Sequence, residues 1–178
     1  MVLGTGNVLF GDEGLGVHLA SLLRRNYRFN SVHQVEVVDG GTLGPHLIPL
    51  LAEQDRVLLL DTIKAEESEP GEVFCFDYEK VPARVNWQGS AHEVEMRQTL
   101  AMMKMAGDLP RITVLAAVPE IISETSFKLT PPLLRAAALM ESKALALLTE
   151  WEVAAERIDT VSVEQIARNC CRGYTVVA

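Results

Sequence analysis

Three acidic side chains follow three segments that the sequence marks as strands. Glu13 comes after a first strand and its glycine loop, Asp39 ends a β-branched segment, and Asp61 ends a continuously apolar one. In open α/β sheets, ligands bind beyond the carboxyl ends of the strands, where the strand order reverses. If the first strand lies between the other two, Glu13 and Asp61 face each other across that point. His92, in the first turn of a later predicted helix, can reach the same edge.

These residue types suit a metal site, because a Glu, an Asp and a His are credible ligands for a borderline divalent ion such as nickel or zinc. Each residue also has a purely structural explanation. Asp12 can cap the helix that follows, with Glu13 in its first turn. Asp61 can cap the next segment, and Asp39 precedes two glycines, where an Asx turn is sufficient. His92 can be a solvated surface residue, so the single motifs leave both roles open.

Other chemistries fit the sequence poorly. A dinucleotide loop needs a third glycine where Leu9 stands, and two carboxylates at the end of this loop would repel a pyrophosphate. His92-Glu93 begins like a zinc-peptidase helix, but Met96 occupies the place of the second histidine. There is no Gly-x-Ser-x-Gly elbow. Cys75 falls in a strand pattern, where a packed thiol is more common than a nucleophile.

The predicted elements alternate between strand and helix. Strands are expected at 1–3, 33–39, 56–61, 72–77 and 111–118, and helices at about 12–26, 47–53, 91–106 and 131–151. This order indicates a three-layer α/β fold: a mostly parallel twisted sheet of about five strands with helices on both faces. The strand at 72–77 can be antiparallel or peripheral, because only a loop joins it to its predecessor. Thr130 is expected to cap the last long helix, and Met102, Met103 and Met105 to fill the core.

Length and composition bound the function. A chain of 178 residues is expected to form one domain over 1–178, in which 151–178 is a tail with at most a small helix at about 161–168 and a strand or frayed end at 174–178. The net charge of −8 argues against nucleic acid as a partner. We find no signal peptide and no apolar run long enough to insert in a membrane. Three cysteines, with Cys170 and Cys171 adjacent, are no disulfide framework, which favours the cytoplasm.

Taken in order, four motifs resemble the maturation endopeptidases of [NiFe]-hydrogenases. The resemblance runs from residue 1 to about 151, and the ordered set is specific although no single piece is. The motifs are Gly4-x-Gly6-Asn7-x-Leu9-x-x-Asp12-Glu13-Gly14-x-Gly16, Asp39-Gly40-Gly41-Thr42, Leu58-Leu59-Leu60-Asp61 and Ser90-Ala91-His92-Glu93.

The resemblance implies a function and a site. Such peptidases remove a C-terminal extension from the hydrogenase large-subunit precursor after nickel insertion, cutting after a basic residue just past the last cysteine motif. The family's metal ligands map onto Glu13, Asp61 and His92, and its processing-linked turn maps onto Asp39-Gly40-Gly41. Candidate catalytic carboxylates of an aspartic-type enzyme are thus Asp39, Glu13 and Asp61. The expected metal is nickel carried by the substrate, although other divalent ions can occupy the site in vitro.

Two mechanisms and two other functions stay open at this point. The shared metal can polarise the scissile carbonyl or activate water, or it can only anchor the peptide while Asp39 transfers a proton. One alternative function is a nickel-dependent chaperone that binds the precursor without cutting it. The other is a nucleotide- or small-molecule-binding α/β domain, which would bind at the loop 4–11 and tolerate changes at His92.

Overall fold

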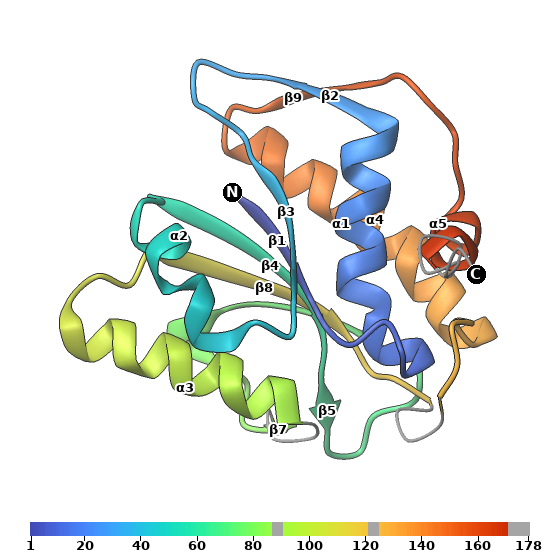
Figure 1. The fold of residues 1–178 in the computed structure, drawn as a ribbon, viewed down its shortest axis with the longest axis horizontal. Coiled ribbons are helices and arrows are strands. Elements are labelled where there is room, and N and C mark those ends of the chain that lie inside the picture. Colours follow the sequence, from blue (N-terminus) through green and yellow to red (C-terminus); the bar gives the residue numbers. More distant parts are fainter. Residues whose placement is uncertain (87–90, 121–124, 171–178) are drawn as a thin grey trace, which may run out of the picture.

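Five strands form the central sheet of the computed structural model, which describes residues 1–86, 91–120 and 125–170, and the side chains of all of these except 86 and 91–94. The sheet order is β3-β1-β4-β8-β6, and β6 is the one antiparallel member (Figure 1). The strands are β1 (Val2–Thr5), β3 (Val37–Gly41), β4 (Arg56–Thr62), β6 (Val73–Asp77) and β8 (Arg111–Ala117). The strand order therefore reverses between β1 and β4, and the expected position of the 72–77 strand at the margin is confirmed.

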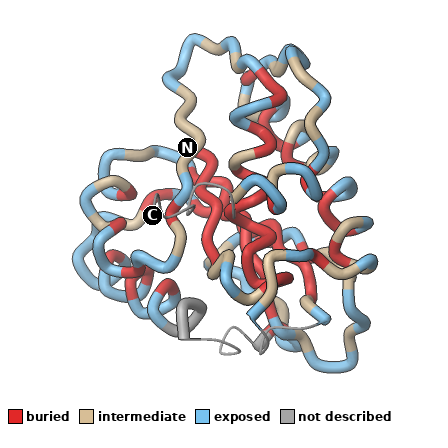
Figure 2. The backbone as a smooth tube through the Cα atoms, turned by 45° about the vertical axis from the view of Figure 1, so that its right-hand side comes forward, coloured by how far each residue is buried: buried red, intermediate tan, exposed pale blue. Residues whose placement is uncertain are grey.

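Helices cover both faces of this sheet, as expected for a three-layer α/β fold. One face carries α1 (Leu15–Asn26) and α4 (Pro131–Glu150), and the other carries α2 (Ile48–Ala52) and α3 (Ala91–Ala106). The side chains of β4 alternate between the two layers: Leu58 and Leu60 join the α1/α4 core, and Val57 and Leu59 join the α2/α3 core. Buried residues accordingly follow the strands and the inner sides of the helices (Figure 2). The continuously apolar β4 is the result of burial on both faces.

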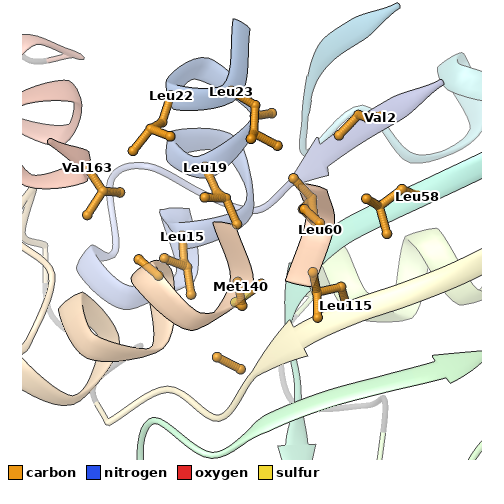
Figure 3. Close-up of a cluster of buried hydrophobic side chains, with 14 of the residues drawn as sticks. Val2, Leu15, Leu19, Leu22, Leu23, Leu58, Leu60, Leu115, Met140 and Val163 are labelled. Carbon is orange, nitrogen blue, oxygen red and sulfur yellow. The ribbon is translucent and has the colours of Figure 1, made fainter. Parts of the chain in front are cut away.

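The α1/α4 core fixes the helix that follows the glycine loop. Leu15, Leu19 and Leu23 of α1 are fully buried and point toward the sheet and α4 (Figure 3). They pack in one cluster with Leu60 of β4 and Met140 of α4. Burying a leucine fully contributes about 1.5–3 kcal/mol, so the start of α1 is held firmly against the sheet.

Several helix starts differ from expectation. A short 3-10 helix, η1 (Gly11–Gly14), precedes α1, which begins at Leu15 and not near Asp12. No side-chain cap bond is made at the start of η1 or of α1, so the prediction that Asp12 caps this helix is wrong. A second 3-10 helix, η2 (Gly44–Leu47), likewise precedes α2. At α4 the expected N-cap position of Thr130 is confirmed, with Pro131 in the first turn.

Residues 154–170 contain more regular secondary structure than the sequence indicated. Strand β2 (Tyr27–Asn30) pairs antiparallel with β9 (Ala154–Arg157), and α5 (Val163–Cys170) follows. Asn26 fastens this segment to the end of α1, because its side chain donates to the Val161 carbonyl oxygen at 2.8 Å and accepts from the Val161 N–H at 3.0 Å. The small helix expected at 161–168 is present, and the strand or frayed end expected at 174–178 lies outside the described residues.

Three smaller elements and one set of methionines complete the fold. The three elements are β5 (Lys64–Ala65), its antiparallel partner β7 (Val85–Asn86) and the 3-10 helix η3 (Tyr78–Lys80). Met103 is buried, but Met102 and Met105 are 55% and 89% exposed, so only one of the three fills the core. Among the described helices, none combines the length and apolar character that a membrane span requires.

Candidate active site

Glu13 is held at the carboxyl end of β1 by a tightly packed loop. It lies in η1 and is only 4% exposed. Gly6, with φ +136°, passes so close beneath it that a Cβ atom there would sit 1.9 Å from the Glu13 carbonyl oxygen. Only glycine permits both this conformation and this approach. The glycine loop therefore serves to fold the Glu13 segment back over the end of the strand.

Asp61 occupies the neighbouring strand end and is fully buried at 0% exposure. Its Oδ1 accepts a hydrogen bond of 2.8 Å from the Thr62 N–H. Leu59 and Ile63 belong to the α2/α3 core, so strand alternation directs Asp61 toward that layer. Buried aspartates are rare unless they have partners, and the Thr62 N–H supplies one.

The start of α1 brings Glu13 and Asp61 to one edge. A Cβ atom on Gly16 would lie 2.2 Å from the Leu60 carbonyl oxygen and 2.4 Å from that of Thr5. The first turn of α1 thus rests directly on the carboxyl ends of β1 and β4. Gly16 follows Glu13 by three residues, and Leu60 immediately precedes Asp61, so this contact holds both acids at one edge. This is the reversal point of the strand order, where the sequence placed the two acids.

Asp39 lies at the same edge but in a different environment. It is exposed, and its Oδ1 accepts from the Gly41 N–H at 3.0 Å, which is the Asx turn that the sequence allowed. It stands beside Gly4 in the β1–β3 register, and the Gly6 N–H donates to the Gly41 carbonyl oxygen at 3.0 Å. The turn accounts for one carboxylate oxygen and leaves the side chain accessible to a substrate.

His92 is the second residue of α3, and its side chain lies outside the described residues. Helix α3 begins beside β5 and β7, at the end of the sheet where β4 stops (Figure 1). One turn further on, the Glu95 carboxylate lies against Gly44, just past the Asp39 turn. Among the described side chains, no three His, Cys, Asp or Glu residues lie close enough together to hold a metal ion. The side chain of His92 is not among those described.

Two further titratable groups, His18 and Cys75, are poorly suited to catalysis. His18 is 2% exposed beneath Gly14, and desolvation lowers the pKa of its imidazole to about 4, so it is neutral at pH 7 and adds no positive charge beside Glu13. Cys75 is exposed on β6 and not packed as expected, and desolvation raises the pKa of its thiol. A nucleophilic cysteine needs the opposite shift.

A family model and individual known proteins both match this sequence. A family model described as hydrogenase maturation protease matches residues 17–147. Protein HydD of Wolinella succinogenes is 45% identical over 159 residues, which are 89% of this chain and 100% of that protein. The hydrogenase 2 maturation protease of Escherichia coli is 32% identical over 132 residues, which are 74% of this chain and 79% of that protein. The chain belongs to the hydrogenase maturation protease family.

A solved structure from the same family shares the fold. The hydrogenase maturating endopeptidase HybD from Escherichia coli matches with a TM-score of 0.79 at 30% identity, over 88% of this chain and 95% of that one. Membership of the hydrogenase maturation protease family confirms the expected family, the α/β architecture and the activity class, a hydrolase that acts on peptide bonds. In this protease the three acids predicted from the sequence, Glu13, Asp39 and Asp61, lie at the carboxyl edge of the sheet, and Glu13 and Asp61 are buried.

Sequence reasoning missed one residue at this edge. Asp12, expected to cap α1, is 1% exposed and accepts hydrogen bonds from Glu120 and Thr130, more than a hundred positions away in the chain. The capping motif is a local pattern, whereas these donors come from the loop after β8 and from the start of α4. The local signal for Asp12 was its position between Gly11 and Gly14, just before a helix, where burial can be expected.

Proposed function

We propose that this protein removes the C-terminal extension of a nickel-loaded [NiFe]-hydrogenase large-subunit precursor in the cytoplasm, and that Glu13, Asp61 and His92 bind the substrate's nickel. The observation that supports this most strongly is the burial of Glu13 and Asp61 at one sheet edge, at 4% and 0% exposure. Two buried carboxylates at the point of strand reversal favour a cation. Helix α3, in which His92 is the second residue, begins at the end of the sheet where β4 stops (Figure 1), which supports including His92 in the proposed ligand set.

The nickel is part of the substrate in this proposal. Two carboxylates and an imidazole leave coordination positions for ligands that the precursor supplies, so the metal is shared while the two proteins are in contact. Nickel-free precursor lacks this anchor and is bound weakly. The enzyme thereby delays cleavage until the metal is in place.

Asp39 is the proposed general base. It is exposed at the same edge, and its Asx turn fixes the backbone while one oxygen stays available. A carboxylate so placed can take a proton from the attacking water as the scissile bond is broken. The shared metal can polarise the scissile carbonyl in the same step, or it can serve as the anchor alone.

A cleavage assay tests the proposal. Purified protein is mixed with nickel-loaded and with nickel-free precursor, and product mass is read for wild type, Glu13→Gln, Asp61→Asn and His92→Ala. We expect wild type to release one C-terminal fragment from the nickel-loaded precursor alone, and the three variants to release none. Asp108→Asn and His33→Ala, both at exposed positions away from this edge, are the matched controls and should cleave normally.

Other outcomes would replace the proposal. Nickel-dependent binding of the precursor by wild type without cleavage would support the chaperone. Equal cleavage of nickel-free and nickel-loaded precursor would remove nickel recognition. Normal cleavage by His92→Ala would take that residue out of the ligand set.

A further inference from the structure

The Asp12 carboxylate joins three segments of the chain. Its Oδ2 accepts from the Glu120 N–H at 3.0 Å and from the Thr130 hydroxyl at 2.9 Å, and its Oδ1 accepts from the Thr130 N–H at 2.8 Å. Asp12 is 1% exposed. Hydrogen bonds to a buried carboxylate are short and strong, so these bonds lock η1 to the loop after β8 and to the start of α4.

Backbone bonds next to Asp12 act in the same direction. The Gly11 N–H donates to the Ser126 carbonyl oxygen at 2.5 Å, and the Ser126 N–H donates to the Leu9 carbonyl oxygen at 2.9 Å. The residues just before Glu13 are therefore fastened to the 125–130 segment on one side, while Gly6 packs against Glu13 on the other.

The element that carries Glu13 needs such support. η1 is a four-residue 3-10 helix without a side-chain cap bond. Short 3-10 helices have poor hydrogen-bond geometry and little stability of their own. The position of Glu13 must therefore be set by contacts outside η1, and the side chain of the preceding residue supplies three of them.

We infer that Asp12 is a positioning residue that holds Glu13 in the orientation in which it binds the substrate's nickel, an inference that rests on the proposed function. Groups that orient metal ligands are commonly worth about 10–100-fold in metal affinity or activity. Asp12 would have this effect through the backbone of η1, which it shares with Glu13. Asparagine cannot replace Asp12, because in either orientation its amide nitrogen would face a backbone N–H donor, that of Glu120 at the Oδ2 position or that of Thr130 at the Oδ1 position.

A role confined to stability is the competing explanation. Thr130 is the N-cap residue of α4 and makes no cap bond with its own hydroxyl, so the Asp12 bonds could serve only to fasten that helix. A stability role would lower the melting temperature and weaken binding of all precursors alike. A positioning role lowers the preference for nickel-loaded over nickel-free precursor, and does so through Glu13.

The test measures that preference as the ratio of the two dissociation constants, with the thermal midpoint recorded for each variant. We expect Asp12→Asn to lower the ratio about 10–100-fold. Thr130→Val, which removes a single hydroxyl, should lower it a few-fold. Thr149→Val makes the same change in the last turn of α4, where the hydroxyl bonds to the Leu145 carbonyl oxygen, and should leave the ratio unchanged.

A double-variant cycle identifies the route of the effect. Asp12→Asn combined with Glu13→Gln should lower the ratio no further than Glu13→Gln alone, because Asp12 acts through Glu13. If the two substitutions lower the ratio additively, the inference is wrong. It is also wrong if Asp12→Asn and Thr130→Val both keep the ratio measured for wild type. If Asp12→Asn does not fold, Thr130→Val decides by the same criterion. A wild-type ratio of about one would instead overturn nickel recognition itself, and this inference with it.

Discussion

The loops after β1 and β4 hold their acids differently from the loop after β3. Glu13 and Asp61 are 4% and 0% exposed, whereas Asp39 is exposed in an Asx turn. A buried carboxylate loses hydration, which makes a bound cation more favourable there than at the surface. An exposed carboxylate keeps its hydration and can exchange protons with water. Under the proposed function, this contrast favours cation binding by the first two loops and proton transfer by the third.

The largest effect should come from removing a buried acid. Asp61→Asn keeps an acceptor for the Thr62 N–H but removes the charge, so we expect nickel-dependent binding and cleavage to fall by about 100-fold or more. Stability should change by no more than about 1 kcal/mol, because the hydrogen bond survives. Cleavage assays and urea unfolding on the same preparation check both parts. Comparable losses in stability and activity would mean that Asp61 only supports the fold.

The exposed acid should separate catalysis from binding. Asp39→Asn preserves the Asx turn, since the amide oxygen still accepts from the Gly41 N–H. We expect kcat to fall about 100-fold while the dissociation constant of nickel-loaded precursor stays within about twofold. Single-turnover cleavage and equilibrium titration measure the two quantities. A weakened dissociation constant with unchanged kcat would erase the distinction between the loops.

The close contact between the first turn of α1 and the ends of β1 and β4 can be broken by adding a side chain to the helix. Gly16→Ala places a Cβ atom 2.2 Å from the Leu60 carbonyl oxygen, and we expect a loss of about 3 kcal/mol in the free energy of unfolding. Gly107→Ala is the control: nothing lies within 4 Å of its Cβ position, and its φ of +84° should cost about 1 kcal/mol. Equal losses in urea unfolding would show that α1 can shift without strain.

The neutral imidazole beneath this edge predicts a smaller, pH-dependent effect. Burial lowers the pKa of His18 from 6.5 to about 4, so protonation favours the unfolded chain. Its contribution is complete above pH 6.5 and is lost as the pH falls toward 4, by about 2 kcal/mol between pH 7 and pH 5. His18→Gln should flatten that part of the urea-unfolding profile, with His33→Gln as the exposed control. If the pH dependence of the unfolding free energy is the same in His18→Gln as in wild type, the lowered pKa of His18 is contradicted.

Much of the fold could be predicted from local pattern. The apolar run Val57–Leu60 marked a strand buried on both faces, and Thr130 with Pro131 marked the start of α4. Strands β2 and β9 were missed because each is four residues long and their partners lie far apart, as Tyr27 and Arg157 do. No local pattern encodes a pairing at that separation.

The site could be predicted in outline but not in its support. Acids after strands indicated the edge, and the structure brings Glu13, Asp61 and Asp39 there. Glu13 and Asp61 are buried whereas Asp39 is exposed, and this difference depends on the whole fold. The contacts of Asp12 could not be predicted for the same reason. Its donors, Glu120 and Thr130, approach it only when β8 and α4 are in place.

Whether Glu13, Asp61 and His92 bind the substrate's nickel can be measured from the coordination of nickel while the protein is in contact with the precursor. Nickel-loaded precursor is mixed with wild type and frozen before cleavage, and nickel X-ray absorption is compared with that of the precursor alone. We expect added oxygen and nitrogen ligands with wild type, and fewer with Glu13→Gln, Asp61→Asn or His92→Ala. An identical spectrum with and without wild type, under conditions where the two proteins bind, would contradict this expectation.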